Sequence, residues 1–205
     1  MSQSGAIVLT QALLATGVRC LADVDADLAA IVDEHGDPPL WAREPGFPTL
    51  IHIILEQQVS LASARAAFNR LSEASGELTP ERFLQFNDDE LRGFGFSRQK
   101  ALYGRELSRT ILSGNLDLAS LPTLDDQAVR HELMQVKGIG RWTADIYLLM
   151  ALLRPDVWPA GDLALVKAVQ EVKKLPAGST IDTAIWKPWR AVAARIFWHY
   201  YLSTR

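Results

Sequence analysis

The sequence predicts an all-α fold, and three observations support this prediction. Apolar residues recur at intervals of three and four along most of the chain, a spacing typical of helices that bury one face. Clusters of glycine, proline and small polar residues interrupt this spacing at short intervals. No segment shows the strict alternation of apolar and polar residues that indicates a half-buried strand. We therefore expect about eight to ten short helices whose packing against one another forms the core.

The expected helices begin near the N-terminus. Leu9–Leu14 and Leu28–Val32 come first. The four prolines within His35–Pro48 exclude a helix in that segment. Leu50–Leu61 follows, and its first six residues are apolar except for one histidine, which predicts burial. Ala64–Leu71 is the next expected helix, before a segment with the composition of a turn.

Further helices are expected in the rest of the chain, each separated from the next by helix-breaking residues. These helices are Arg98–Leu112, Asp126–Val136, Thr143–Leu153, Leu163–Val172 and Trp189–Leu202. The separating segments are Gly93–Ser97, Ser113–Pro122, Arg154–Gly161 and Leu175–Thr180. No internal repeat joins these segments into a longer array, so we expect a compact helical domain.

Length and composition limit the class of protein. A chain of 205 residues is long enough for one well-buried core or for two small lobes that share a cleft. With 48% hydrophobic and 22% charged residues the composition is globular, and no apolar run approaches the roughly 18 residues of a membrane span. Cys20 is the only cysteine, which excludes an internal disulfide, a cysteine-ligated iron–sulfur cluster and a zinc knuckle. Met1–Thr10 lacks the features of a secretory signal, so we expect a soluble, cytoplasmic protein that does not bind membranes.

The segment Val136–Ala144, Val-Lys-Gly-Ile-Gly-Arg-Trp-Thr-Ala, predicts a phosphate-binding turn. Two glycines that flank an apolar residue, followed by Thr and Ala at the start of a helix, form a tight turn whose backbone N–H groups point outward at a helix N-terminus. Lys137 and Arg141 stand on either side of this turn and add positive charge. Because the net charge of the chain is −3, any contact with nucleic acid has to be local. The motif therefore predicts a nucleic-acid partner that is bound through this turn.

Asp162 follows Trp-Pro-Ala-Gly and opens the next apolar helix. A carboxylate at this position lies against the free N–H groups of the first helical turn, and the helix dipole favours its charged form. Such a carboxylate can stabilise positive charge that develops on a deoxyribose. Asp is also a common N-cap residue, so a purely structural role is the alternative. Replacing Asp162 with Asn keeps the cap and removes the charge, which separates the two roles.

Glu56, Gln57 and Gln58 interrupt the apolar character of Leu50–Leu61. Buried amides are costly unless they are paired, so a helix this apolar is expected to direct its polar end toward solvent or toward a cleft. Gln57 and Gln58 are thus candidates for contacting DNA from the minor groove, where an inserted side chain can fill a vacated position in the base stack. An ordinary exposed helix end accounts for the same residues equally well.

The pattern as a whole resembles the helix-hairpin-helix (HhH-GPD) DNA glycosylases, and within them the 3-methyladenine DNA glycosylase II, or AlkA-like, branch. The resemblance extends from about Phe47 to Trp198 and rests on pieces in the family's order and spacing. These pieces are Gly46–Leu50, Ile54–Ser60, Gly95–Ala101, Val136–Ala144, Ala160–Ala164, Trp186–Ala191 and Phe197–Trp198. The resemblance implies one domain over residues 1–205, folded as two helical lobes with a central cleft and no N-terminal β domain. Lobe A is expected at about 1–60 and 165–205, and lobe B at about 61–164, with the helix-hairpin-helix at 126–153.

In this family the residue at the position of Asp162 is the essential acid, so the resemblance implies that Asp162 is catalytic. Trp142 stands where relatives that cleave the strand through a Schiff base have lysine, which implies a monofunctional enzyme that uses water as its nucleophile. The indole of Trp142 is also expected to form the base pocket, because alkylation gives a purine a positive charge and cations favour aromatic faces. At Ile146 some relatives have tyrosine, so this chain departs from the family there.

The resemblance assigns DNA binding to the hairpin and to the end of Leu50–Leu61. Backbone N–H groups around Gly138 and Gly140, together with the Thr143 hydroxyl, are expected to bind one phosphate beside the lesion, and Gln58 takes the wedge position. In relatives a monovalent cation binds carbonyls of the hairpin. Here that Na⁺ or K⁺ would be bound by the carbonyls of Met134, Val136 and Ile139, and no other cofactor is expected.

The sequence thus predicts a monofunctional DNA glycosylase of base excision repair. It is expected to flip an alkylated purine, 3-methyladenine or 7-methylguanine, out of double-stranded DNA and to hydrolyse its N-glycosidic bond. We expect a monomer that is associated with the nucleoid in the cytoplasm. Two alternatives stay open: a glycosylase for deaminated or etheno bases, and a non-catalytic helix-hairpin-helix module that only binds DNA.

Overall fold

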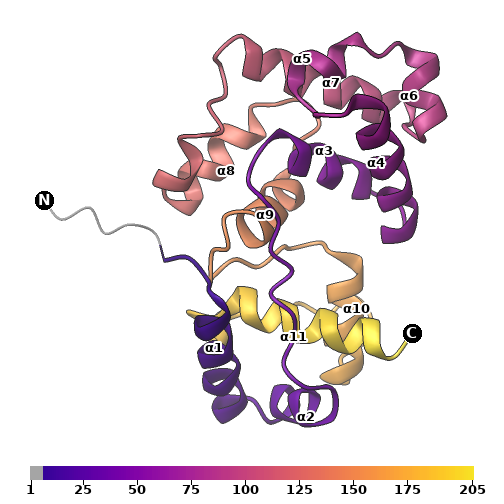
Figure 1. Cartoon of the computed structure of the whole chain (residues 1–205). Helices are drawn as coiled ribbons and strands as arrows, with labels where there is room; N and C mark the ends of the chain where they lie inside the picture. The colour runs from indigo at the N-terminus through magenta and orange to yellow at the C-terminus, as the bar shows by residue number, and fades with distance from the viewer. Residues whose placement is uncertain (1–6) are drawn as a thin grey trace, which may run out of the picture. The chain divides into compact units, whose positions relative to one another are not determined.

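The structure, a computed structural model, describes residues 7–205 and consists of helices joined by turns and loops (Figure 1). Eleven α-helices and two short 3-10 helices occur in this range, without any β-strand. The prediction of an all-α fold is therefore confirmed. None of the helices in residues 7–205 is long and apolar enough to cross a membrane.

The chain divides into two compact units. Unit 2 comprises Arg43–Tyr147, while unit 1 comprises the residues up to Ala42 together with Leu148–Arg205. The sequence placed these divisions near residues 60 and 165, so both fall earlier in the structure than expected. The packing of one helix in each unit explains the difference.

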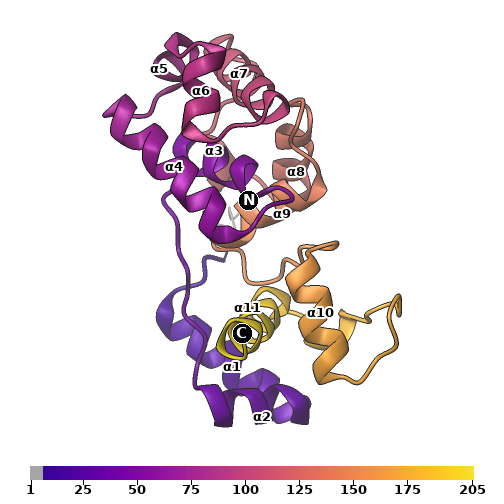
Figure 2. The same ribbon diagram turned by 90° about the vertical axis from the view of Figure 1, so that its right-hand side faces the viewer.

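In unit 2 the central helix is α3 (Figure 2). Its residues Leu50, Ile51 and Ile53 are fully buried, and it packs against α4 and α7. Because these two partners follow residue 60 in the chain, α3 folds with them, and the first division falls before it. The helices of this unit are α3 (Phe47–Glu56), α4 (Leu61–Ser75), α5 (Pro80–Gln85), α6 (Asp88–Phe94), α7 (Arg98–Leu112), η1 (Leu121–Thr123), α8 (Asp126–Met134) and most of α9 (Arg141–Met150).

The junction between α3 and α4 differs from the expected helices Leu50–Leu61 and Ala64–Leu71. Helix α3 ends at Glu56, and Gln58 adopts a positive φ of 57°, which a helix cannot continue through. Ser60 then caps α4, because its Oγ accepts a hydrogen bond from the N–H of Ser63 at 3.2 Å. The polar residues at the end of α3 therefore form a loop between two helices.

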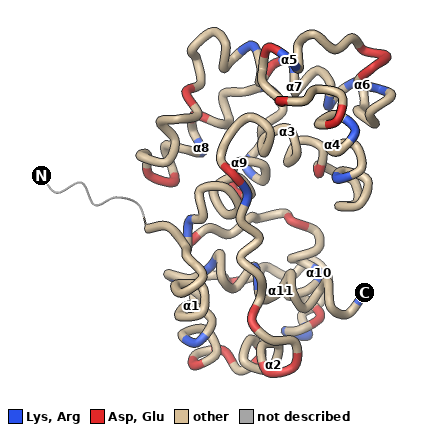
Figure 3. Tube along the Cα trace, viewed as in Figure 1, with Lys and Arg blue, Asp and Glu red and all other residues tan. Residues whose placement is uncertain are grey.

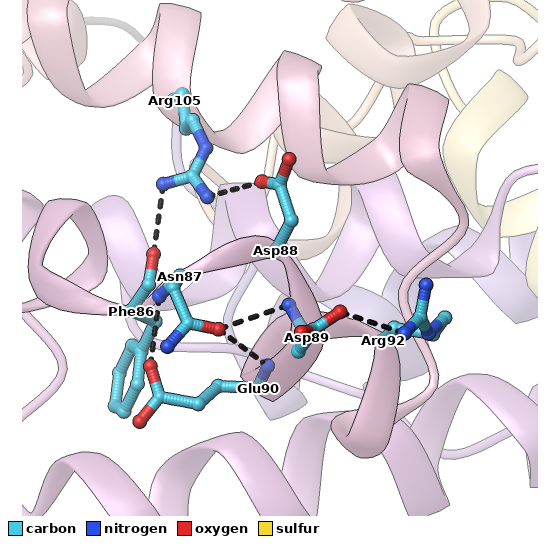
Figure 4. A network of polar contacts seen from close by, with 7 residues as sticks. All are labelled: Phe86, Asn87, Asp88, Asp89, Glu90, Arg92 and Arg105. Atoms are coloured by element: carbon cyan, nitrogen blue, oxygen red, sulfur yellow. Dashed lines mark hydrogen bonds and ion pairs between the residues drawn. The ribbon is translucent and has the colours of Figure 1, made fainter.

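Helices α5 and α6 were not expected from the sequence. They have six and seven residues, too few turns for a periodic apolar pattern to be recognised. Local hydrogen bonds define α6 instead: the Asn87 Oδ1 accepts from the N–H groups of Asp89 and Glu90, and the Glu90 carboxylate accepts from the Asn87 N–H (Figure 4). Arg105 of α7 binds the same end of α6, because its Nη2 donates to Oδ1 of Asp88 at 2.6 Å.

In unit 1 the central helix is α11, which packs against α1, α2 and α10 (Figure 2). Its Arg195 is fully buried and donates hydrogen bonds to the carbonyls of Leu40 at 2.9 Å and Leu149 at 2.8 Å. Burial lowers the pKa of Arg195 to about 10. These bonds fasten the end of α9 to α11, which explains why the second division precedes Leu148. The helices of this unit are α1 (Gln11–Val24), α2 (Ala26–His35), α10 (Leu163–Val172), η2 (Ala184–Trp186) and α11 (Arg190–Ser203).

Helix α1 is longer than the predicted segment Leu9–Leu14. It continues through Gly17, a residue of low helix propensity, to Val24. The ring of Trp189 packs directly against Gly17, where an added Cβ would lie 2.9 Å from the indole Cε3. Close packing of α1 on the start of α11 therefore offsets the weak local propensity.

Candidate nucleic-acid interface and candidate catalytic carboxylate

The predicted hairpin joins α8 and α9 within unit 2. The N–H of Ile139 donates to the Val136 carbonyl at 3.0 Å, and both of these side chains are buried. The N–H of Ala144 donates to the carbonyl of Gly140 at 3.1 Å, which makes Gly140 the residue that precedes α9. The first N–H groups of α9 have no acceptor within the helix, and such groups attract an anion.

The two glycines of the hairpin have different roles. Gly138 has a φ of +96°, and a Cβ added to it would lie 2.1 Å from Cγ of Tyr103, so the tyrosine ring occupies the space of a side chain. Gly140 has no atom within 4 Å of the position of an added Cβ. Gly138 is therefore required by the fold of the turn, whereas Gly140 leaves the outer side of the turn open to a ligand.

Gln57 braces the hairpin from the inside of unit 2. Its Nε2 donates to the carbonyl of Gly138 at 2.9 Å and to Oγ1 of Thr143 at 3.0 Å. Thr143 is buried, so its hydroxyl faces Gln57. The sequence predicted DNA contacts for both residues and did not predict this bond between them. It connects the end of α3 directly to the hairpin.

Gln58, the expected wedge residue, is exposed on the loop between α3 and α4. Val59 beside it is 46% exposed, which gives this loop an apolar as well as a polar surface. Lys100 of α7 supports the loop, because its Nζ donates to the carbonyl of Leu55 at 2.6 Å and covers the C-terminal end of α3. Burial lowers the pKa of Lys100. The loop is thus held by Gln57 on one side and by Lys100 on the other.

The remaining predicted residues of the hairpin occupy its surface. Lys137 and Arg141 are exposed, and Trp142 at the start of α9 is half-buried. Ile146, at the position where the family pattern differs, is buried. Lys and Arg are dispersed among Asp and Glu along both units, so the positive charge at the hairpin is a local feature (Figure 3).

The sequence reasoning missed Asp145, which is fully buried in α9. Its carboxylate accepts from Nε of Arg130 at 2.6 Å and from Nε of Arg141 at 2.9 Å. The signal was present in the sequence: Asp145 interrupts an apolar segment just as Gln57 and Gln58 interrupt the apolar segment Leu50–Leu61.

Asp162 lies in unit 1 and is the N-cap of α10. Its Oδ1 accepts from the N–H of Leu165 at 2.8 Å and from Nε1 of Trp198 at 3.1 Å. The carboxylate is half-buried and fixed by helices α10 and α11 together. Capping thus coexists with a fixed orientation, which a catalytic carboxylate also requires. The sequence did not predict Trp198 as a partner of Asp162.

Metal-binding side chains do not gather in residues 7–205, where no three His, Cys, Asp or Glu residues are arranged to hold an ion. Backbone carbonyls of the hairpin keep acceptor capacity beyond their hydrogen bonds. Met134 is the last residue of α8, where helix carbonyls lack partners within the helix, and the Val136 carbonyl has a second lone pair beyond the one used by Ile139.

Comparison with protein families matches residues 51–191 to the HhH-GPD superfamily of base excision DNA repair proteins. DNA-3-methyladenine glycosylase 1 of Schizosaccharomyces pombe is 31% identical over 76% of this chain and 72% of its own length. A protein of Bacillus subtilis that is provisionally named a DNA-3-methyladenine glycosylase is 29% identical over 83% of this chain. The chain spans 64% of the length of that relative.

Solved structures give the same result. The S. pombe 3-methyladenine DNA glycosylase in complex with abasic DNA has a TM-score of 0.82 at 28% identity, covering 89% of this chain and 95% of that one. A DNA-3-methyladenine glycosidase of Bacillus halodurans has a TM-score of 0.70 at 27% identity, covering 90% and 88%. The chain belongs to the HhH-GPD superfamily of base excision DNA repair proteins.

Proposed function

We propose that this protein is a monofunctional DNA glycosylase that hydrolyses the N-glycosidic bond of alkylated purines, 3-methyladenine and 7-methylguanine, in double-stranded DNA. The observation that carries the proposal is the carboxylate of Asp162, which Leu165 and Trp198 hold in a fixed orientation. Two relatives support the substrate class, since the S. pombe and Bacillus halodurans proteins are named for 3-methyladenine excision. The S. pombe structure contains abasic DNA, the product of such a reaction.

Asp162 supplies the charge that the reaction requires. As the bond between C1′ and N9 breaks, positive charge develops on the deoxyribose, and a fixed carboxylate stabilises it. The purine leaves with the bonding electrons, which neutralise the charge that alkylation gave it, so no acid has to protonate it. Water forms the new bond to C1′, and Asp162 accepts the proton that this water loses. The products are the free base and an abasic site.

Unit 2 supplies the contacts to DNA in this proposal. The N–H groups at the start of α9, beside the open side of Gly140, bind a backbone phosphate, and Lys137 and Arg141 add charge to the same place. Gln58 enters the stack from its exposed loop and fills the place of the flipped nucleotide. Trp142 stacks on the cationic base and, because it replaces a lysine, provides no amine for a Schiff base.

A monovalent cation, Na⁺ or K⁺, bound by the carbonyls of Met134, Val136 and Ile139, forms part of the proposal. When bound, this cation adds positive charge to the hairpin beside the phosphate. No other cofactor is required by the reaction, because water and a carboxylate are sufficient. We also propose that the protein acts as a monomer at the nucleoid.

The test is incubation with duplex DNA that carries methylated purines. Free base is measured by chromatography, and strand breakage is measured before and after alkali. Base release with breakage only after alkali supports the proposal, whereas breakage without alkali contradicts a monofunctional enzyme. Release only from duplexes with hypoxanthine or ethenoadenine favours the alternative substrates, and DNA binding without any release favours a binding module.

Asp162→Asn is the variant that tests the catalytic carboxylate. Asn caps helices about as well as Asp, so the free energy of unfolding is expected to change by less than about 0.5 kcal/mol. Loss of the charge is expected to lower the rate of base release by a factor of at least about 10². An Asp162→Asn protein that folds and releases base at the original rate would refute the assignment.

A further inference from the structure

We propose that Asp145 is a positioning residue for DNA binding: it aims the guanidinium of Arg141 at a backbone phosphate beside the hairpin. This inference rests on the proposed function, because it assumes that the hairpin binds DNA. Asp145 itself is fully buried and does not reach a ligand. Its effect is exerted through the arginine that it holds.

The two arginines that bind Asp145 differ in exposure and in their other hydrogen bonds. Arg130 of α8 donates its Nε to Oδ1 and its Nη1 to the Asp126 carbonyl at 3.1 Å, and its side chain is 16% exposed. Arg141 donates its Nε to Oδ2, and its side chain is 61% exposed. Among the hydrogen bonds within residues 7–205, Arg141 uses only its Nε. Arg130 therefore anchors the carboxylate, while the Nη groups of Arg141 are presented to solvent.

This arrangement is not expected to increase the stability of the fold over that of an apolar contact. A cation in the first turn of a helix is unfavourable because it meets the positive end of the helix dipole, and Arg141 is the first residue of α9. Buried ion pairs contribute little net stability compared with apolar residues of the same volume. Two guanidinium groups on one carboxylate leave a local charge of +1 at the start of α9. An anion is the partner that such a site fits.

The fork of arginine explains how one side chain serves both purposes. Guanidinium has donors on several sides of a rigid plane, so the Nε can bind a carboxylate while the Nη groups bind a phosphate. Lysine has a single ammonium at the end of a flexible chain and cannot make both contacts in fixed directions. The orientation that Asp145 gives, and not the charge alone, is therefore expected to determine the contribution of Arg141.

The experiment measures the affinity of the full-length protein for a duplex that carries a tetrahydrofuran abasic analogue, by fluorescence anisotropy over a range of KCl concentrations. Arg141→Ala is expected to weaken binding about tenfold and to reduce the slope of log Kd against log salt by about 1. Arg141→Lys retains the charge at an exposed position and is expected to bind about as weakly as Arg141→Ala. Arg141→Lys with the affinity of the parent protein would overturn the inference.

Asp145→Asn provides the second test, in the parent protein and together with Arg141→Ala. Removing a negative charge makes the site more positive, so charge alone predicts tighter binding. Positioning predicts weaker binding in the parent and no further effect when Arg141 is already absent. Weaker binding by the same factor in both backgrounds, or tighter binding in either, overturns the inference. If Asp145→Asn does not fold, the comparison of Arg141→Lys with Arg141→Ala decides alone.

This readout is independent of catalysis. If the protein binds the abasic analogue but releases no base from methylated DNA, the proposed function fails, and the role of Asp145 is still measured. If base is released and Arg141→Lys binds like the parent, the role of Asp145 fails and the proposed function stands.

Discussion

The hairpin glycines offer a matched pair of substitutions, Gly138→Ala and Gly140→Ala, whose effects the structure separates. At Gly138 the φ of +96° is strained for alanine, at a cost of about 1–3 kcal/mol. The new methyl would also lie 2.1 Å from Cγ of Tyr103, and moving a packed ring aside costs about another 1–3 kcal/mol. The sum is about 4 kcal/mol, which for a chain of this size lowers Tm by roughly 8–16 °C.

At Gly140 the same substitution adds a methyl that meets no atom within 4 Å. Alanine is a poorer residue than glycine before a helix, but it restricts the unfolded chain, and the two effects nearly cancel, to within about 1 kcal/mol. The methyl does, however, project from the outer side of the turn, where the phosphate is expected to approach. Losing a charge-assisted hydrogen bond there is expected to raise the Kd for duplex DNA about tenfold or more.

The assay combines thermal unfolding, followed by circular dichroism, with anisotropy measurements on a duplex that carries an abasic analogue. Gly138→Ala should lower the Tm, and its DNA affinity should fall because the turn that binds the phosphate is distorted. Gly140→Ala should keep the Tm of the parent and lose only affinity. Equal stability of the two variants, or unchanged affinity in Gly140→Ala, would show that the hairpin is not divided into a structural and a ligand-facing glycine.

Two further predictions concern unit 1. Trp198→Phe removes the indole N–H that donates to Asp162 but leaves the hydrogen bond from the Leu165 N–H. Single-turnover base release should therefore slow about tenfold with little change in KM. An unchanged rate would show that the indole hydrogen bond is not needed. Burial acts to raise the pKa of Asp25, but hydrogen bonds from Lys173 and Trp186 outweigh burial and lower the pKa below its ordinary value of 3.8. The ionised Asp25 therefore contributes stability that is fully present above pH 3.8 and is lost as the pH falls through the lowered pKa. Urea unfolding of Asp25→Asn between neutral pH and pH 2 should therefore show a weaker acid dependence than the parent, and an identical dependence in both proteins would contradict this origin.

Local signals in the sequence were sufficient for the fold class and for the positions of the main motifs. An apolar period of three to four residues reports which face of a helix is buried, without reference to the rest of the molecule. The cap of α10 by Asp162 involves a residue only three positions away, and the turn before α9 is encoded in a few consecutive residues. Helix ends were less accurate, because the loop after α3 depends on the cap of the following helix.

Tertiary packing decided which of these residues act together. Gln57 lies 81 positions from Gly138, and Trp198 lies 36 positions from Asp162, so no local pattern relates the members of either pair. The two glycines of the hairpin look alike in sequence, yet only Gly138 is covered by Tyr103. The physical reason is that periodicity and capping depend on neighbours along the chain, whereas contacts between distant side chains are set only when the helices pack.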